Sequence, residues 1–218
     1  MRAIGPRWTL ANALGLGLGL AAIRAAIPGF RGDSFQPGDE AAFSLLTPQS
    51  VLLLIGTGLP VGLALSLLQW WAIRPWLDQA QRWIPLTLGG LVLGWLLGVA
   101  FGVPLGRLAT WLLPVQAVWQ QTLIRVTIAL VIGSLLGAGL GLVQGFAWRG
   151  QPSLPWRWTR VSAVGGGLGF TVMLLCLALF DTLIAPDRTA AALVAAFLAG
   201  ALAGAAGSLV TGRWLTSL

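Results

Sequence analysis

The sequence contains no histidine, no tyrosine and no lysine, and it has one cysteine and one glutamate among 218 residues. General acids and bases, nucleophile–base pairs and zinc ligands are drawn mainly from these residue types. Acidic residues are scarce as well, with six in the whole chain. The sequence therefore predicts a protein without enzymatic activity, with no catalytic residue and no metal ligand.

The same scarcity limits the cofactors that the chain can hold. The lone cysteine, Cys176, excludes an internal disulfide and any multi-cysteine metal site. A haem or chlorophyll would find no histidine ligand and would depend on Asn12, Gln69, Gln144, a backbone carbonyl or water. The sequence requires no cofactor, and it is compatible with a bound lipid or pigment.

Apolar residues dominate what is present. They make up 57% of the chain, charged residues make up 9%, and the mean hydropathy is +0.86, which is too apolar for a soluble globule. Lipid tolerates only helices and closed barrels, and the chain lacks the alternation of barrel strands. A hydrocarbon core of about 30 Å takes roughly 20 helical residues. We predict an all-α integral membrane protein, a single domain over 1–218, with about six transmembrane helices at 8–28, 48–73, 84–103, 122–148, 160–185 and 189–212.

Charge is distributed unevenly between the two sides of this predicted bundle. One side has five arginines against five acids. The side with both termini has one acid, Asp78, and eight arginines: Arg2, Arg7, Arg74, Arg82, Arg149, Arg157, Arg160 and Arg213. Because arginine is retained on the cytoplasmic side during insertion, both termini are predicted to be cytoplasmic. Membrane topology thus explains the net charge of +7, and no nucleic acid is expected as a partner.

Two parts of the chain match each other at an offset of 75 residues. The pattern L-x-L-x-Q-x4-R-x7-R-W-x6-G-x3-G occurs at 65–94 and again at 140–169. Each copy spans the loop between two apolar stretches, so the repeated units are helical hairpins, at 48–103 and 122–185. Both hairpins enter the membrane in the same direction, and a pseudo-twofold axis along the membrane normal is expected between them.

The remaining segments are expected to lie outside this repeat. The first and last helices, at 8–28 and 189–212, carry no convincing copy of the pattern. The segment 29–47 holds three acids with glycine and proline, which is typical of an external loop. The segment 104–121 has apolar residues at helical spacing, which predicts a helix lying flat in the external interface.

Gln69 and Gln144 are repeated polar residues inside the predicted helices. Each lies four or five residues from the cytoplasmic end of its helix, where a primary amide needs hydrogen-bond partners. Their equal depth suggests that they face each other across the axis between the repeats. Either they form an interhelical hydrogen bond that holds the bundle together, or they present a polar pair to a ligand.

Arginine and tryptophan side chains flank the repeated loops. Arginine binds phosphate bidentately, and tryptophan favours the membrane interface. The candidates for contacts with lipid headgroups are Arg74, Arg82, Trp83, Arg149, Arg157 and Trp158. Insertion topology and an aromatic belt explain the same residues without a bound ligand.

Glycines recur at every fourth position in several predicted helices. Such stripes allow helix backbones to approach closely. They serve either packing within the bundle, or an oligomer interface, or a groove for an apolar molecule. The stripes consist of Gly90, Gly94, Gly98 and Gly102, then Gly133, Gly137, Gly141 and Gly145, then Gly165 and Gly169, and finally Gly200 and Gly204.

Few charges lie inside the predicted helices. Arg24, Arg125 and Asp181 lie near the external ends, where Asp181 is a candidate ion-pair partner for either arginine. Snorkelling of the side chains to the interface is the alternative. Pro60 interrupts a backbone hydrogen bond near mid-membrane and is a candidate hinge.

Two segments carry a family resemblance. They read GLALSLLQWWAIRPWLDQAQRWIPLTLGGLVLGWLLG and GAGLGLVQGFAWRGQPSLPWRWTRVSAVGGGLGF. They resemble the G-L-x-Q-W-x-x-x-R hairpin repeat of small, mostly uncharacterised multi-pass membrane proteins of cyanobacteria, although Gly145 replaces the tryptophan of the pattern in the second copy. The resemblance implies a location in the plasma or thylakoid membrane.

Two functions remain open at this point. The first is an accessory or scaffold subunit of a larger membrane assembly, which the resemblance would place in a photosynthetic complex. Its partners would be membrane lipids and another membrane protein or a second copy of the chain. The second is a transporter of lipids or small solutes with a site between the repeats, past Gln69, Gln144 and Pro60. A solid, glycine-packed interior favours the scaffold, and a polar cavity reaching mid-membrane favours transport.

Overall fold

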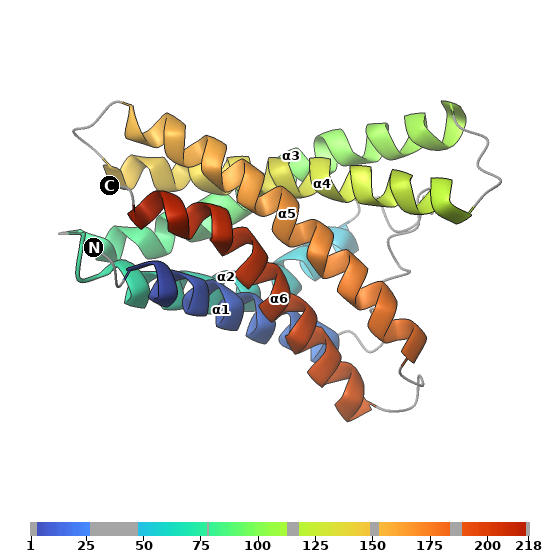
Figure 1. The fold of residues 1–218 in the computed structure, drawn as a ribbon, viewed down its shortest axis with the longest axis horizontal. Helices are drawn as coiled ribbons and strands as arrows, with labels where there is room; N and C mark the ends of the chain where they lie inside the picture. Colours follow the sequence, from blue (N-terminus) through green and yellow to red (C-terminus); the bar gives the residue numbers. More distant parts are fainter. Residues whose placement is uncertain are drawn as a thin grey trace.

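The computed structural model describes residues 4–26, 48–77, 79–112, 118–148, 153–183 and 189–216. Every regular element in these ranges is a helix, which confirms the predicted all-α class (Figure 1). The elements are α1 (Ile4–Ala26), α2 (Pro48–Ile73), α3 (Trp83–Leu112), α4 (Val118–Gln144), α5 (Leu154–Leu183) and α6 (Thr189–Thr216), with short 3-10 helices η2 (Ala80–Arg82) and η3 (Gly145–Trp148).

The segments predicted on either side of the first hairpin, at 29–47 and 104–121, do not appear as expected in the described residues. The residues expected to begin an interfacial helix belong instead to α3, which continues through Pro104 to Leu112. A proline inside a membrane helix is tolerated where neighbouring groups bond the carbonyl that it leaves free. The segment 29–47, expected to be an external loop, lies outside the described residues.

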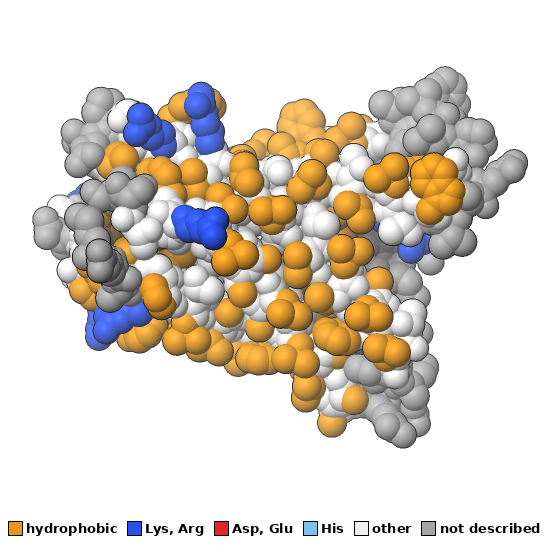
Figure 2. Space-filling model, viewed as in Figure 1, with side chains coloured by type: hydrophobic (Ala, Val, Ile, Leu, Met, Phe, Trp, Pro, Cys, Tyr) orange, Lys and Arg blue, Asp and Glu red, His pale blue; other side chains and the backbone are white. Residues whose placement is uncertain are grey.

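Four helices of the described part are long and apolar enough to cross a membrane: Ile4–Ala25, Thr122–Trp148, Leu154–Phe180 and Thr189–Thr216. The described apolar part of α2, Gly58–Ile73, is shorter. Figure 2 shows hydrophobic side chains spread over the middle of the face in view, while most visible arginines lie toward the end that carries both termini. This surface has the character of an integral membrane protein.

The helices form a closed ring in chain order. Each helix contacts the next one along the chain, and α6 contacts α1 to complete the ring. Both termini lie at the same end of the bundle (Figure 1). The first and last helices are therefore part of the ring and do not flank two separate hairpins.

Small residues set the distance between neighbouring helices. A Cβ atom added at Gly15 or Gly90 would lie 2.8 Å from the Cα atom of Leu65 or Leu140, and one added at Gly165 would lie 2.8 Å from the carbonyl oxygen of Gly207. The other described glycines of the predicted stripes meet a neighbouring helix closely as well, except Gly98, where a Cβ atom would meet only side chains of α4 at 3.4–3.6 Å. The surroundings of Gly102 lie outside the described residues. The stripes thus pack the bundle internally.

Two adjacent glycines of α3 allow this packing to be tested. Gly90→Ala should lower the free energy of unfolding by about 1–3 kcal/mol, because the new methyl group meets the backbone of α4. Gly89→Ala meets only the Cγ1 atom of Val143, at 3.7 Å. This control should be neutral or stabilising by up to about 1 kcal/mol, because alanine favours helix. Thermal unfolding in detergent measures both, and equal midpoints would contradict the packing role of Gly90.

Candidate functional site

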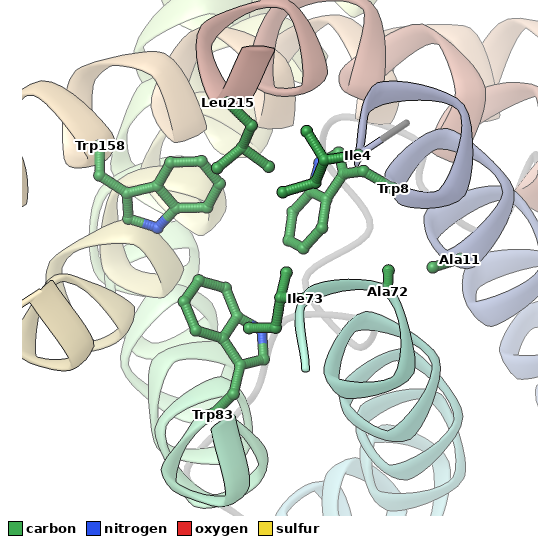
Figure 3. Close-up of a cluster of buried hydrophobic side chains, with 8 residues drawn as sticks. All are labelled: Ile4, Trp8, Ala11, Ala72, Ile73, Trp83, Trp158 and Leu215. Atoms are coloured by element: carbon green, nitrogen blue, oxygen red, sulfur yellow. The ribbon is translucent and has the colours of Figure 1, made fainter. Parts of the chain in front are cut away.

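Three tryptophans meet at the centre of the bundle, near the end that carries the termini (Figure 3). They are Trp8 of α1, Trp83 of α3 and Trp158 of α5, all at most 2% exposed. Their ring centroids are 5.7, 5.9 and 6.0 Å apart, which is nearly an equilateral triangle, and the rings meet edge to face. This geometry is the favoured one for aromatic pairs. We call these residues the tryptophan triad.

Each indole of the triad donates a hydrogen bond to the preceding even-numbered helix of the ring. The Nε1 atom of Trp83 donates to Gln69 Oε1 at 3.0 Å, and Nε1 of Trp158 donates to Gln144 Oε1 at 3.1 Å. The third indole, Trp8, donates to Thr211 Oγ1 at 2.8 Å. Every buried indole N–H of the triad is thereby satisfied inside the protein.

The two glutamines also bond to each other, as their equal depth suggested. The Nε2 atom of Gln144 donates to Gln69 Oε1 and to Thr87 Oγ1, both at 2.9 Å. The Nε2 atom of Gln69 donates to Asn12 Oδ1 at 2.8 Å, and Asn12 in turn donates to the Trp8 carbonyl oxygen at 2.8 Å. Gln69 and Gln144 are 2% and 0% exposed. Their polar atoms are thus engaged by other protein groups.

The arrangement reveals a third copy of the repeat. The odd-numbered helices share the pattern R-W-x3-[N/T/S]-x2-G-x3-G at an offset of 75 residues. Its three copies are Arg7, Trp8, Asn12, Gly15 and Gly19; Arg82, Trp83, Thr87, Gly90 and Gly94; and Arg157, Trp158, Ser162, Gly165 and Gly169. This corrects the expectation that the first helix stands outside the repeat.

The even-numbered helices carry a matching pattern, G-x3-G-x3-[S/G]-x2-[Q/T]. Its copies are Gly58, Gly62, Ser66 and Gln69; Gly133, Gly137, Gly141 and Gln144; and Gly200, Gly204, Ser208 and Thr211. The repeating unit is therefore an odd-numbered helix followed by an even-numbered one, and the axis is pseudo-threefold. The expected pseudo-twofold axis is wrong, because it left out α1 and α6.

The third copy escaped the sequence comparison for two reasons. It has Thr211 where the other copies have glutamine, and Thr211 follows the tryptophan of its own unit by 53 residues, against 61 in the other two units. The Arg-Trp pair at position 7 was the signal that could have found it.

The substitution at Thr211 breaks the symmetry of the network. Its hydroxyl accepts from Trp8 and donates to the carbonyl oxygen of Gly207 at 3.3 Å, so it does not reach across as the glutamine amides do. Ser162 occupies the position of Thr87, and its buried hydroxyl has no hydrogen-bond partner among the described residues. One corner of the triangle is thus less well satisfied than the other two.

The predicted headgroup contacts divide into two groups. Trp83 and Trp158 belong to the buried triad, so the prediction that they contact headgroups is wrong. A tryptophan with an internal acceptor for its N–H need not stay at the interface. Arg74, Arg82 and Arg157 are exposed, as a headgroup contact requires, and Arg149 lies outside the described residues.

Other tryptophans occupy the outer surface at this end. Trp71, Trp76 and Trp156 are exposed. The guanidinium of Arg7 lies 5.8 and 5.9 Å from the ring centroids of Trp71 and Trp76. The guanidinium of Arg160 lies 5.1 Å from the ring centroid of Trp156. These cation–π pairs, and not Trp83 and Trp158, have the character of an interfacial belt.

The predicted ion pair of Asp181 with Arg24 or Arg125 and the possibility of a metal site were the remaining candidates. Arg125 is exposed, and the side chain of Asp181 lies outside the described residues, so the predicted ion pair stays a prediction. The described residues contain no group of three histidine, cysteine, aspartate or glutamate side chains that could hold a metal ion.

The network contains indoles, amides and hydroxyls, none of which gains or loses a proton near neutral pH. The network therefore joins neighbouring helices by hydrogen bonds, and we call these bonds the lock. Comparisons of the chain with protein families, with curated proteins and with solved structures find no match.

A double-mutant cycle tests the lock. Trp158→Phe removes the indole donor, and Gln144→Met removes the acceptor while keeping the side-chain length. Each single variant should unfold more easily, and the coupling energy between them should be about 0.6–1.7 kcal/mol, as for other hydrogen bonds in membrane proteins. Chemical or thermal unfolding in detergent supplies the four free energies.

The matched control replaces Trp156, which lies two residues away and is 56% exposed. A cycle of Trp156→Phe with Gln144→Met should show no coupling. A coupling energy near zero for the Trp158 cycle, or equal coupling in both cycles, would contradict the lock.

Proposed function

We propose that this protein is a non-enzymatic integral membrane protein that serves as an accessory or scaffold subunit of a larger membrane assembly. In this proposal all six helices span the membrane, and both termini are cytoplasmic. The observation that carries it is the closed interior near the triad, where the triad indoles and the side-chain amides of Gln69 and Gln144 bond to other protein groups. The resemblance to the cyanobacterial hairpin proteins makes the plasma or thylakoid membrane the proposed location, and a photosynthetic complex the proposed host.

A transport path needs polar groups that face a solute. Gln69, Gln144 and Thr87 are buried polar groups beside the tryptophan triad, and their hydrogen bonds are made within the protein. The tryptophan triad fills the axis at the same depth. A solute passing here would have to break several buried hydrogen bonds, each with no water to replace it. The buried hydrogen bonds therefore favour a rigid scaffold subunit over a pore.

The outer surface supports the same proposal. Large apolar side chains are exposed on every helix, among them Leu18, Leu67, Val92, Leu130 and Leu209. In a membrane this surface contacts lipid or the helices of another membrane protein. Rigid packing inside and apolar side chains outside are what a subunit requires if its role is to hold neighbouring helices in place.

A transporter of lipids is the second candidate function. One observation favours it: α2 and α3 separate toward the end away from the termini. No described atom lies within 4 Å of a Cβ atom placed on Gly58 of α2. A lateral opening of this kind would admit an acyl chain without crossing the tryptophan triad.

Isolation from the native membrane separates the two candidates. A tagged copy of the protein, solubilised with a mild detergent, should co-purify with a membrane protein in fixed stoichiometry on a native gel, identified by mass spectrometry. An unrelated tagged membrane protein of similar size controls for adventitious association. Recovery of the chain as a monomer or homodimer with bound lipid alone would contradict the scaffold proposal and favour the lipid transporter.

A further inference from the structure

The pseudo-threefold repeat creates three equivalent interfaces between an even-numbered helix and the next odd-numbered one: α2–α3, α4–α5 and α6–α1. In each, the even-numbered helix carries two glycines at equivalent positions of the repeat. The pairs are Gly58 and Gly62, Gly133 and Gly137, and Gly200 and Gly204. Because the register is the same, differences between the interfaces can be traced to single residues.

Two of the interfaces are closed. A Cβ atom on Gly137 would meet the backbone of Ser162 and would lie 3.0 Å from the Cα atom of Gly166 in α5. A Cβ atom on Gly204 would meet the backbone of Asn12 and would lie 2.7 Å from the nitrogen of Ala13 in α1. Backbone lies against backbone in both cases, as in close membrane helix pairs.

The third interface is open. A Cβ atom on Gly62 would meet only side chains of α3, with Cδ2 of Leu88 at 2.8 Å and Cδ1 of Leu91 at 3.4 Å. One helical turn further, a Cβ atom on Gly58 would have no described atom within 4 Å. Cβ atoms on its counterparts Gly133 and Gly200 would meet the backbones of α5 and α1. The gap therefore widens from Gly62 toward Gly58, away from the tryptophan triad.

Leu88 accounts for the difference. Alanine stands at both equivalent positions, as Ala163 in α5 and Ala13 in α1. An alanine leaves room for the glycine of the facing helix, while the isobutyl group of Leu88 fills that space and holds α3 away from Gly62. Leu88 thus acts as a wedge between two helices whose glycines otherwise match the closed pairs.

The two ends of the interface differ in their freedom to move. At the closed end, the hydrogen bond from Trp83 to Gln69 joins α3 to α2. Beyond Gly62, the exposed Pro60 removes one backbone hydrogen bond from α2, which lowers the resistance of that helix to bending. A fixed pivot, a bendable segment and a wedge are the elements of a two-position hinge.

We propose that the α2–α3 interface is a lateral gate in the membrane, which alternates between the open position and the closed geometry of α4–α5 and α6–α1. In the closed position the Leu88 side chain rotates away and the backbone of α3 covers Gly58. The gate depends on neither of the two functions proposed above, since its evidence is the comparison of three equivalent interfaces.

Disulfide cross-linking tests this gate. In the closed α4–α5 pair, a Cβ atom on Gly133 would lie 2.5 Å from the Cβ atom of Phe170. The equivalent pair at the gate is Gly58 and Trp95. A disulfide needs Cβ atoms roughly 3.5–4.5 Å apart, a separation that is reached as the gap narrows toward this closed geometry. Gly58→Cys and Trp95→Cys, in a Cys176→Ala background, should therefore cross-link as the gate closes and not in the open position.

The wedge is then varied in this background. Leu88→Ala should raise the rate of oxidative cross-linking on the order of tenfold, which corresponds to a shift of about 1.4 kcal/mol toward the closed position. Leu88→Ile keeps the volume of the wedge and serves as the matched control, with a rate close to that of the parent. Equal rates for all three proteins, or no cross-link in any of them, would overturn the gate.

A single-cysteine measurement covers the case in which the double variant does not fold. Gly58→Cys meets no described atom within 4 Å and should be tolerated. A nitroxide attached there should be mobile in the parent, immobilised by Leu88→Ala and still mobile with Leu88→Ile. Unchanged mobility in the Leu88→Ala protein would overturn the proposal on its own.

Discussion

The indole N–H group of each triad tryptophan has to find an acceptor inside the protein, and the rest of the bundle is arranged around this requirement. An unbonded donor buried in an apolar interior costs several kcal/mol. Gln69, Gln144 and Thr211 supply the three acceptors, each from the even-numbered helix that precedes the tryptophan in the ring. Every such bond ties two helices together at one depth.

Close packing follows from the same arrangement. Once the triad fixes the starts of α1, α3 and α5, each of these helices runs along the even-numbered helix that follows it in the chain. Its glycines meet the backbone of that following helix. Leu65 and Leu140 meet Gly15 and Gly90, while Gly207 meets Gly165. The third unit thus keeps the geometry although its acceptor is the shorter Thr211. The symmetry fails in three places: at Thr211, which does not reach across as the glutamines do, at the unbonded hydroxyl of Ser162, and at Leu88.

Hydropathy and periodic spacing predicted much of this fold. The predicted segment 48–73 coincides with α2, and the shared depth of Gln69 and Gln144 anticipated their hydrogen bond. The position of the tryptophans was not predictable in the same way, because an indole is equally suited to the interface and to a buried site with an acceptor. Trp83 follows Gln69 by fourteen positions across a loop, and only the folded chain shows that the two side chains meet. The third repeat was hidden by a threonine in place of glutamine.

The central claim is that the three triad indoles are locked by internal hydrogen bonds. Hydrogen exchange at the indole N–H groups, followed by NMR of the protein in detergent with isotope-labelled tryptophan, measures this lock directly. The N–H protons of Trp8, Trp83 and Trp158 should exchange far more slowly than that of the exposed Trp156, and Gln144→Met should accelerate exchange at Trp158 above all. Exchange at the triad as fast as at Trp156, or no response of Trp158 to the loss of Gln144, would contradict the account.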